Sequence, residues 1–456
     1  MMLITFSENE DYSSAVPFII LDFDSYQNYL YSAQSCVVNW IRVNNFVFES
    51  GKYLIIPTPE GNIQEVIYFT DFPFSQHDFS QLPSSLPCNR YRLVQWPEQF
   101  IYDIALAWIN GCYKFDVFRK DEKEHPLLFV PPSEHIDKAR TVANSVYKIR
   151  NMINLPASHM GPEHLAATLC ELAKDTGSSF SIFEKNDLQL GFPLINAVGQ
   201  GSQRSPLLAE LNWGDPAHPK VVLIGKGISF DTGGLNIKNP ASMLNMKKDM
   251  AGAALAIGVA ESIIRSVLPI RLQVLIPAAE NAVSDTAFRP GDVILSRSDL
   301  TIEITNTDAE GRLILADALT YACEASPSLI IDFATLTGSA RVALGTEIGA
   351  VFTNRDSEWD LLERSSVLTM DPLWRMPLWQ GYEKKLHSNI ADLKNSSGGL
   401  GTAITAALFL KNFVKPSVPW IHLDIAAWAE ESQAGTIPGG VAQSFYAVIH
   451  YLENKF

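Results

Sequence analysis

The sequence is organised around one segment, which reads Asn306-Thr307-Asp308-Ala309-Glu310-Gly311-Arg312-Leu313. It follows a strand-like alternation at residues 300–305 and overlaps the start of a helical pattern of apolar residues at 313–325. If the segment is extended, alternate side chains share one face, so Asp308, Glu310 and Arg312 would point into one space. Two acids and a base gathered where a strand ends predict a chemical site.

A helix cap is the structural explanation of the same segment. Thr307 followed by Glu310 three residues later fits a capping box, and acidic residues are common at helix starts. Arg312 fits this explanation poorly, because a cation in the first turn faces the positive end of the helix dipole. The position of Arg312 therefore favours a functional role.

Length and composition indicate a protein with more than one packed core. A chain of 456 residues that is 47% hydrophobic exceeds one ordinary domain. Its cysteines are scattered, odd in number and without a CxxC pair, which argues against a disulfide framework and a thiolate zinc site. We expect reduced, buried thiols at Cys36, Cys88, Cys112, Cys170 and Cys323.

The charge indicates which partners to expect. A net charge of -15 and a pI near 5.1 give no general attraction to polyphosphate, so nucleic acid is not an expected partner. Residues 1–12 are acidic and lack the features of a secretion signal, and no apolar run approaches the ~18 residues of a membrane span. We expect a soluble, cytoplasmic protein that does not associate with membranes.

The order of elements predicts an α/β protein of two domains. A small mixed α/β domain is expected at residues 1–130 and a larger catalytic domain at 131–456, with a turn-rich passage between them. After a connecting helix at 135–153, strands and helices alternate, which predicts a mostly parallel, helix-covered central sheet. The other expected elements are strands 15–21, 53–57, 66–70, 221–224, 272–277, 329–333 and 420–425, and helices 100–113, 162–173, 250–267 and 441–452.

Chemistry in such a sheet lies beyond the carboxyl ends of its strands. Directly after strand 221–224 comes a glycine-rich run, Gly225-Lys226-Gly227-Ile228-Ser229-Phe230-Asp231-Thr232-Gly233-Gly234. A phosphate loop is an alternative, but GxxxxGK[ST] is absent and Lys226 precedes the turn instead of opening a helix. Lys238 lies twelve residues past Lys226, and Asp249 lies eleven residues further, before a helix of small residues.

Four of the candidate side chains are carboxylates, at Asp231, Asp249, Asp308 and Glu310. Like charges held a few ångströms apart in a partly buried site repel strongly, so the cluster implies bound cations or shared protons. Two divalent ions about 3.5 to 4 Å apart, bridged by carboxylates, satisfy this requirement.

The histidines do not add to this site. None of the nine forms an HExxH or HxxEH pattern. We expect His159 and His164 to be surface or capping residues, and His422, within a buried strand, to be a core histidine with its hydrogen bonds satisfied.

At these positions the sequence resembles the leucyl aminopeptidase family of cytosolic dinuclear zinc peptidases. Segment 306–313 matches the family signature without a change, and residues 225–250 follow its second block in spacing. The similarity runs from about residue 150 to the C-terminus, with further matches at 280–281, 289–292, 334–338 and 420–426, whereas the N-terminal domain is only weakly similar and is shortened. A glycine-rich block also departs from the family, which has a Thr-Gly pair and then an arginine where this chain has Thr436-Ile437-Pro438-Gly439-Gly440.

The resemblance implies two divalent metal ions per subunit, Zn²⁺ and/or Mn²⁺. By position, Asp231 and Glu310 would contact both metals, and Asp308 would complete the looser site. Lys226 and Asp249 would complete the tighter site, where a dication displaces the proton of the lysine so that its nitrogen can donate a lone pair. A water that bridges the metals would have its pKa lowered toward neutrality and would act as the nucleophile.

The resemblance also assigns roles to two cations. Lys238 would stay charged and polarise the scissile carbonyl. Arg312 would hold a bicarbonate that relays the proton of the nucleophile, and the backbone at Leu336 and Gly338 would help to seat that anion. This role explains why a cation stands against the helix dipole.

The implied function is a metallo-aminopeptidase that acts on peptides with a free N-terminus, assembled as a homohexamer. The substrate α-amine would ligate a metal, which restricts cleavage to the first residue. Met246, Thr335 and Gly338 match positions that line the pocket for that residue, and their small or apolar character favours Leu or Met. Met246 can also be explained as filler of the core.

Two other classes of function are alternatives. One is a DNA-associated architectural protein in which catalysis is secondary, although every ligand position is intact and the chain is acidic. The other is a dinuclear phosphoesterase. That class usually recruits histidines and basic phosphate clamps, whereas this site offers one lysine and one arginine.

Overall fold

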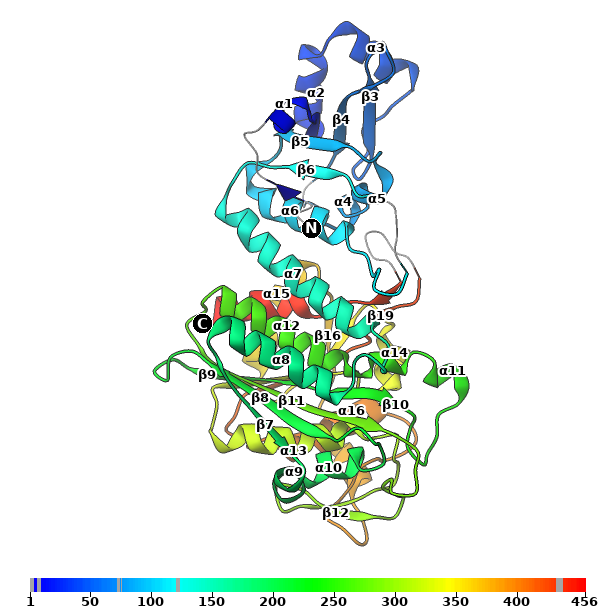
Figure 1. Cartoon of the computed structure of the whole chain (residues 1–456), viewed down its shortest axis with the longest axis vertical. Coiled ribbons are helices and arrows are strands. Elements are labelled where there is room, and N and C mark those ends of the chain that lie inside the picture. Colours follow the sequence, from blue (N-terminus) through cyan, green and yellow to red (C-terminus); the bar gives the residue numbers. More distant parts are fainter. Residues whose placement is uncertain (1–3, 6–9, 72–73, 75, 120–123, 432–437) are drawn as a thin grey trace. The chain divides into compact units, whose positions relative to one another are not determined.

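Figure 1 shows the computed structural model of the chain, which describes residues 4–5, 10–71, 74, 76–119, 124–431 and 438–456. The chain forms two compact units, of which the first comprises the described residues up to Tyr147 together with Glu431, and the second comprises Lys148–Glu430 and Pro438–Phe456. The division falls within α7 (Glu134–Asn154), the helix expected at 135–153. Each unit combines a sheet with helices, which confirms the expected α/β class.

The first unit contains a six-stranded sheet in the order β1-β6-β5-β2-β4-β3. Its strands are β1 (Ile4–Thr5), β2 (Val16–Leu21), β3 (Tyr53–Pro57), β4 (Ile63–Phe69), β5 (Arg90–Gln95) and β6 (Leu127–Phe129). Neighbouring strands are parallel except β3 and β4. Aromatic residues fill its core, where Phe18 meets the rings of Tyr91 and Trp108 edge-on. The three strands expected here are confirmed.

Short helices complete the first unit. They are α1 (Glu10–Ser14), α2 (Phe23–Ser32), α3 (Ser35–Val43), α4 (Gln76–Phe79), α5 (Leu82–Ser85), the 3-10 helix η1 (Glu98–Phe100) and α6 (Ile101–Gly111). The helix expected at 100–113 is thus confirmed as α6, which is apolar along most of its length and is buried from Ile104 to Ile109.

A nine-stranded sheet forms the centre of the second unit, in the order β16-β15-β18-β14-β9-β11-β8-β7 with β10 paired to β11. The strands are β7 (Ser179–Glu184), β8 (Leu207–Trp213), β9 (Lys220–Gly225), β10 (Gly227–Asp231), β11 (Arg271–Asn281), β14 (Leu329–Ala334), β15 (Gly349–Thr353), β16 (Leu373–Arg375) and β18 (Trp420–Asp424). The central strands β18, β14, β9 and β11 are parallel, whereas β15, β8 and β7 join antiparallel. The mostly parallel sheet is therefore confirmed.

Helices cover both faces of this sheet, with α8, α12 and α15 on one face and α9, α10 and α13 on the other in Figure 1. The helices are α8 (Pro162–Thr176), α9 (Asn186–Gly191), α10 (Pro193–Gly199), α11 (Pro240–Met243), η2 (Met246–Met250), α12 (Ala251–Arg265), α13 (Gly311–Glu324), α14 (Gly338–Leu344), α15 (Asp356–Thr369), η3 (Gln380–Leu386), α16 (Thr402–Lys411) and α17 (Phe445–Lys455). Helix α12 can approach the sheet closely because Gly252 has no side chain. A Cβ at that position would lie 2.1 Å from the carbonyl oxygen of Phe333. Strands β9 and β14 are buried because helices cover both faces of the sheet.

Two expected elements differ in extent. The strand expected at 300–305 is reduced to β13 (Thr301–Glu303), which pairs with β12 (Val293–Leu295) and β17 (Leu393–Lys394) in a separate small sheet. The last helix begins at Phe445 instead of residue 441, because the carboxylate of Asp371 accepts hydrogen bonds from the amides of Ser444 (2.9 Å) and Tyr446 (3.0 Å). A residue distant in sequence therefore sets this helix start.

The glycine-rich block near residue 440 is described only in part. Gly439–Gly440 form β20, which pairs with β19 (Trp428–Ala429). Thr436 and Ile437 lie outside the described residues, so the structure does not address the departure from the family at those two positions.

The five cysteines are free, but they are not all buried. Cys112 and Cys323 are buried and Cys170 is partly buried, whereas Cys36 and Cys88 are exposed. The expectation of buried thiols is therefore wrong for Cys36 and Cys88. Both lie on solvent-facing parts of the first unit, and the residues next to them in the sequence do not indicate this exposure.

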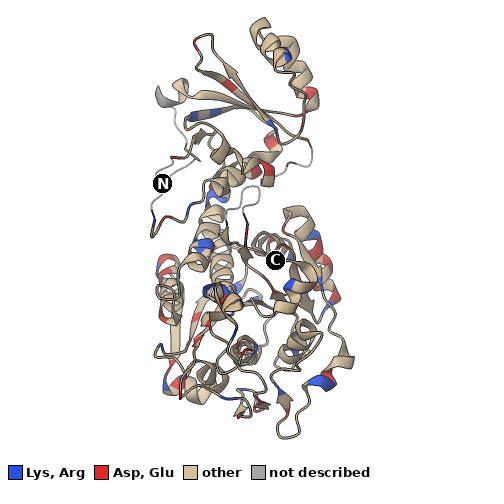
Figure 2. Ribbon diagram, turned by 90° about the vertical axis from the view of Figure 1, so that its right-hand side faces the viewer, with Lys and Arg blue, Asp and Glu red and all other residues tan. Residues whose placement is uncertain are grey.

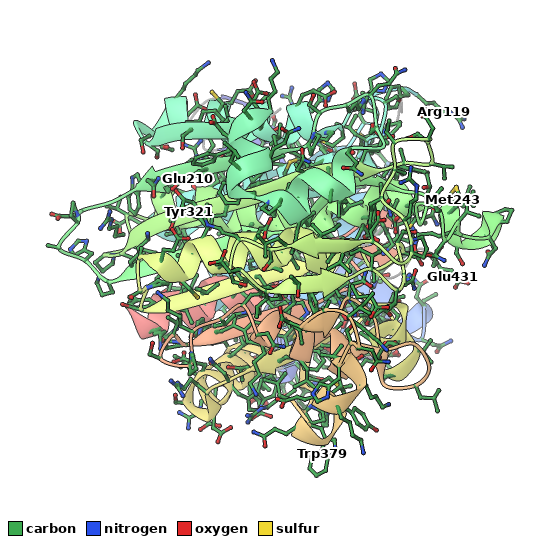
Figure 3. All side chains as sticks on the ribbon, turned by 90° about the horizontal axis from the view of Figure 1, so that it is seen from below. Arg119, Glu210, Met243, Tyr321, Trp379 and Glu431 are labelled. Carbon is green, nitrogen blue, oxygen red and sulfur yellow. The ribbon has the colours of Figure 1, made fainter. Side chains whose placement is uncertain are left out.

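Glu210, a buried carboxylate on the nine-stranded sheet, has several hydrogen-bond partners. Figure 3 shows Glu210 beside Tyr321, whose hydroxyl donates to Glu210 Oε2 at 3.1 Å. Glu210 Oε1 accepts from the side-chain amides of Gln273 (2.6 Å) and Asn212 (2.8 Å). Both oxygens of this buried carboxylate are thus satisfied, and the cluster is explained by folding.

The charged residues of the second unit carry both signs, and Figure 2 shows acidic and basic positions interspersed along its ribbon. Of the helices in the described part of the chain, none combines the length and the apolar character needed to cross a bilayer.

Candidate active site

The central segment is not extended. Residues 307–308 form a turn, Glu310 has helical backbone angles (φ -75°, ψ -36°), and α13 begins at Gly311. The expectation of a shared strand face is therefore wrong. The side chain of Asn306 favours the turn, because its Oδ1 accepts a hydrogen bond from the amide of Asp308 at 2.9 Å.

The capping-box explanation is also wrong. Thr307 Oγ1 donates to the carbonyl of Gly233 (2.6 Å) and accepts from the amide of Asn236 (2.8 Å), so it binds the glycine-rich loop instead of α13. Glu310 occupies the N-cap position without a side-chain capping bond. Thr307 and Glu310, the two residues that a capping box would pair, instead contact other segments around the site.

Lys226 forms the centre of one half of the site. It follows β9, its side chain is only 3% exposed, and its Nζ lies 2.8 Å from Asp249 Oδ2 and 3.1 Å from Glu310 Oε1. Nζ also donates to the carbonyl of Thr335 at 3.0 Å. The hydroxyl of Thr335, at the end of β14, donates to Asp249 Oδ1 at 2.7 Å. Residues from the ends of β9 and β14, from η2 and from the N-cap of α13 therefore meet here.

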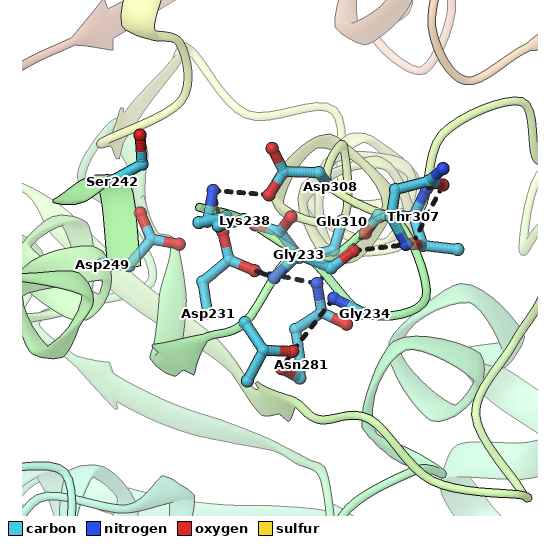
Figure 4. A network of polar contacts seen from close by, with 12 residues as sticks. Asp231, Gly233, Gly234, Lys238, Ser242, Asp249, Asn281, Thr307, Asp308 and Glu310 are labelled. Carbon is cyan, nitrogen blue, oxygen red and sulfur yellow. Dashed lines mark hydrogen bonds and ion pairs between the residues drawn. The ribbon is translucent and has the colours of Figure 1, made fainter. Parts of the chain in front are cut away.

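Lys238 forms the centre of the other half. Its Nζ lies 2.8 Å from Asp231 Oδ2 and 2.5 Å from Asp308 Oδ1, as Figure 4 shows. The other oxygen of Asp231 holds the side chain in place, because Oδ1 accepts a hydrogen bond from the side-chain amide of Asn281 at 2.8 Å. One oxygen from each of Asp231, Asp308 and Glu310 lies within 4.8 Å of the others. All five expected ligand residues and Lys238 are thus brought together.

The cluster has more negative than positive charge. Four carboxylates contact two ammonium groups, which leaves a net charge of -2 when these six groups are ionised. Burial, with the repulsion of Glu310, raises the pKa of Asp231, Asp249 and Asp308. Burial alone would also raise the pKa of Glu310, but the two lysines hold it below its usual value. The lysines therefore balance only part of the charge.

This donor set fits a divalent cation. Oxygen ligands from several carboxylates are suited to such ions, and the excess negative charge would be balanced by one. Glu310 Oε2 is buried and has no hydrogen-bond partner among the described residues. A bound cation would explain why this oxygen, which lies beside two other carboxylates, has no hydrogen-bond donor among the described residues.

Arg312 lies apart from the carboxylate cluster, in the first turn of α13. Its guanidinium is buried and donates from Nη1 to the carbonyl of Asn395 at 2.7 Å, while Nε has no partner among the described residues. Burial lowers the pKa of Arg312 to about 10, against the opposing effect of the Glu310 and Asp424 carboxylates. The side chain is therefore a buried cation whose Nε–H has no partner among the described residues.

The remaining expected residues lie in the loop after β14 and at the starts of two short helices. Met246 opens η2, the same short helix that carries Asp249, and Gly338 opens α14. The amide of Leu336 already donates to Asp424 Oδ1 at 2.9 Å. A second ligand at Leu336 would have to share this donor with Asp424.

The histidines behave largely as expected. His164 Nδ1 accepts from the amide of Gly161 at the start of α8, and exposed His159 contacts Ser158. His422 is a buried core residue whose Nδ1 lies 2.6 Å from Asp332 Oδ1, but its Nε2 has no partner among the described residues. The expectation that all of its hydrogen bonds are satisfied is wrong for that atom.

Sequence reasoning assigned no role to three residues that hold the site in place, although two of them, Asn281 and Asp424, lie in segments that match the family. Asn281 fixes Asp231, Asp424 accepts the amides of Leu336 and Thr337, and Asn395 accepts from Arg312. Asn281 and Asp424 are the last residues of β11 and β18. A search for polar residues at the carboxyl ends of expected strands would have found both.

The fold and the site define a class of protein. It is an α/β protein with a cluster of carboxylates, of the kind that binds cations, at the carboxyl edge of a parallel sheet. Comparison with known proteins specifies it further. The chain belongs to the cytosol aminopeptidase family, whose catalytic-domain model matches residues 148–445, and the model for the M17 aminopeptidase N-terminal domain matches residues 16–131. It is therefore a peptidase of that family, and the resemblance seen in the sequence is confirmed.

Named relatives and solved structures agree with this assignment. A probable cytosol aminopeptidase of Syntrophotalea carbinolica is 40% identical over 395 residues, which cover 82% of this chain and 78% of that protein. The crystal structure of the cytosol aminopeptidase from Coxiella burnetii has a TM-score of 0.94 and 42% identity, over 100% of this chain and 99% of that one. The bottromycin maturation enzyme BotP, in complex with Mn, has a TM-score of 0.86 and 30% identity over 97% and 99% of the two chains.

We predict that Gly311→Ala disables the site without unfolding the protein. A Cβ at Gly311 would lie 2.4 Å from Cε of Lys226, so the flexible lysine must move away from Asp249 and Glu310. Disturbing residues that hold a metal site typically costs about 10- to 100-fold in activity. Hydrolysis of Leu-p-nitroanilide and the Tm measure the two effects.

Thr320→Ala is the matched control for this helix. Among the described residues its hydroxyl donates to the carbonyl of Ala316, within α13 itself, so activity should stay at the parental level. Parental activity in Gly311→Ala would show that the position of Lys226 does not matter.

Proposed function

We propose that this chain is a leucyl-type aminopeptidase that removes Leu- or Met-like first residues from peptides with a free N-terminus. We also propose that it uses two divalent metal ions per subunit, Zn²⁺ and/or Mn²⁺. The observation that carries the proposal is the grouping of Asp231, Asp308 and Glu310, whose oxygens lie within 4.8 Å, in a chain of this family. The Mn complex of BotP supports a metal of this kind.

The five ligand residues divide between two metals. Lys226 and Asp249 would hold one ion and Asp308 the other, while Asp231 and Glu310 would contact both. This division is supported by the ion pairs, since Lys226 contacts Asp249 and Glu310 whereas Lys238 contacts Asp231 and Asp308. When bound, the ions supply Lewis acidity, which orients the substrate amine and lowers the pKa of a water toward neutrality.

Lys238 would act on the substrate. Its side chain is 14% exposed, against 3% for Lys226, so a substrate carbonyl can reach it. A preorganised ammonium beside the scissile carbonyl stabilises the negative charge that develops on its oxygen. Lys238 would therefore remain protonated while Lys226 serves as a ligand.

Arg312 would hold a bicarbonate that accepts a proton from the attacking water. The free Nε donor of this buried cation supports the role, because an anion would satisfy it. The backbone at Gly338 and Leu336 would help to seat the anion, with the Leu336 amide shared with Asp424. In this arrangement Arg312 positions the base and does not touch the metals.

The preference for Leu or Met follows from the proposed pocket. Met246 offers an apolar side chain and Gly338 offers none, while the hydroxyl of Thr335 is committed to Asp249. No charge on these three residues would compensate a charged substrate side chain, whose desolvation is costly. Uncharged first residues are therefore favoured.

We further propose that the protein works in the cytoplasm, as the name of its relatives suggests, with peptides as its partners and without nucleic acid. As an assembly we propose a homohexamer, which rests on the resemblance to the family.

The first prediction of this function is metal dependence. Chelator-treated protein should lose hydrolysis of Leu-p-nitroanilide and regain it with Mn²⁺ or Zn²⁺, because the proposed nucleophile is a water whose pKa the ions would lower. Asp308→Ala should lower occupancy of one metal site only, whereas Asp360→Ala, at an exposed position on α15, should change nothing. Full activity in protein shown to be metal-free by elemental analysis would contradict the proposal.

The second prediction separates the cations. Lys238→Ala should keep both metals and its Tm while kcat falls on the order of 10²- to 10³-fold, the typical cost of one preorganised charge. Lys226→Ala should lose metal as well as rate, and Arg312→Ala should lose activation by bicarbonate. Lys174→Ala, exposed on α8, serves as control. Near-parental kcat in Lys238→Ala, or equal bicarbonate activation of the parent and Arg312→Ala, would contradict this division of roles.

The third prediction concerns assembly. Light scattering should give a mass six times that of the 50.5-kDa chain. A stable monomer with full activity would contradict the hexamer but not the chemistry.

A further inference from the structure

Asn395 is a buried side chain that the proposed chemistry does not use. It follows β17 and has 0% of its surface exposed. The pairing of β17 with β13, which sets Lys394 opposite Glu303, brings it beside the segment that carries Asp308. The ladder ends at this point, so the backbone beyond Glu303 needs other hydrogen-bond partners.

The side-chain amide of Asn395 supplies these partners. Its Oδ1 accepts from the amide of Thr305 (2.8 Å), the hydroxyl of Thr305 (3.2 Å) and the amide of Asn306 (3.2 Å). Its Nδ2 donates to the carbonyls of Asn306 (2.7 Å) and Ala309 (3.4 Å). One side chain therefore takes the place of a neighbouring strand on both sides of Asp308.

The backbone of the same residue reaches the other end of the segment. The carbonyl of Asn395 accepts from Nη1 of Arg312 at 2.7 Å. The turn that carries Asp308 and the guanidinium in α13 are thus fixed to one buried residue, which comes from a loop more than eighty positions later.

We propose that Asn395 is a positioning residue, whose side-chain amide fixes the turn 306–309 so that Asp308 stays beside Asp231 and Glu310. The inference rests on the proposed function and deepens it, since it assigns a residue that sets the geometry of one metal site. Asn395 touches neither substrate nor metal, and it acts through Asp308.

Asn395→Ala tests the inference, because it removes all the side-chain bonds and leaves the carbonyl that binds Arg312. In calorimetric titration of metal-free protein with MnCl₂, the affinity of one site should fall about 10- to 100-fold while the other stays at the parental value. At limiting Mn²⁺, kcat should fall, and excess Mn²⁺ should restore most of it with KM little changed. Recovery of kcat in excess Mn²⁺ would indicate a displaced metal ligand, because a damaged fold would not be restored by metal.

Asn354→Ala is the matched control. Its amide also bridges backbone groups, as it accepts from the amide of Trp420 (3.0 Å) and donates to the carbonyl of Val418 (2.8 Å), but at the amino end of β18. It should lower the Tm and leave Mn²⁺ affinity at the parental value. An equal loss of affinity in Asn354→Ala would overturn the inference.

Thr305→Val provides a milder second variant in case Asn395→Ala does not fold. It removes one hydroxyl that donates to Asn395 Oδ1 and to the carbonyl of Ser396, and the loss of one such bond should weaken the same Mn²⁺ site about fivefold. Parental Mn²⁺ affinities in Asn395→Ala, or in Thr305→Val where the first variant fails to fold, would overturn the inference. A parent protein that binds no Mn²⁺ would instead overturn the proposed function on which it rests.

Discussion

Mutual repulsion among four carboxylates is the constraint on which the rest of the site depends. Two like charges about 5 Å apart repel by roughly 3 kcal/mol at an effective dielectric constant of 20, and burial prevents water from relieving it. Lys226 and Lys238 each contact two of the four acids, so the two ammonium groups leave part of the negative charge unbalanced. A site of this kind is stable only with additional positive charge or bound protons. Burial, together with the repulsion of Glu310, raises the pKa of its three aspartates, and the unbalanced charge makes the site suitable for divalent ions.

The fold meets this constraint by bringing rigid elements to one edge of a sheet. Strands β9, β11 and β14 deliver Lys226, Asn281 and Thr335 to that edge, while α13 starts there with Glu310 at its cap. Small residues permit the crowding, because a side chain at Gly252 or Gly311 would meet backbone or the lysine. Ligands held by packed strands and helix starts keep their positions better than ligands on free loops, which is what a metal site requires.

Local pattern was a good guide to elements and a poor guide to the geometry of the central segment. The buried strand at 221–224 and the helix at 162–173 were recovered because apolar periodicity reflects burial directly. The extended form expected for 306–313 failed, since a hydrogen bond from the Asp308 amide to Asn306 and contacts with a distant asparagine favour a turn. The small sheet that includes β13 and β17 was likewise missed, because two- and three-residue strands carry almost no periodic signal.

The sequence by itself determined the α/β class, the parallel centre of the sheet and which acids and lysines to expect at one candidate site, because residue types, their spacing and resemblance to a family carry that information. It did not determine which acid pairs with which lysine, that Thr307 binds the glycine-rich loop, or that Asn395 holds the turn. Most of those contacts join residues separated by about seventy to ninety positions, and they form only when the strands are in register. Tertiary structure decided them, because each depends on hydrogen-bond groups that become neighbours only after the sheet has closed around the site.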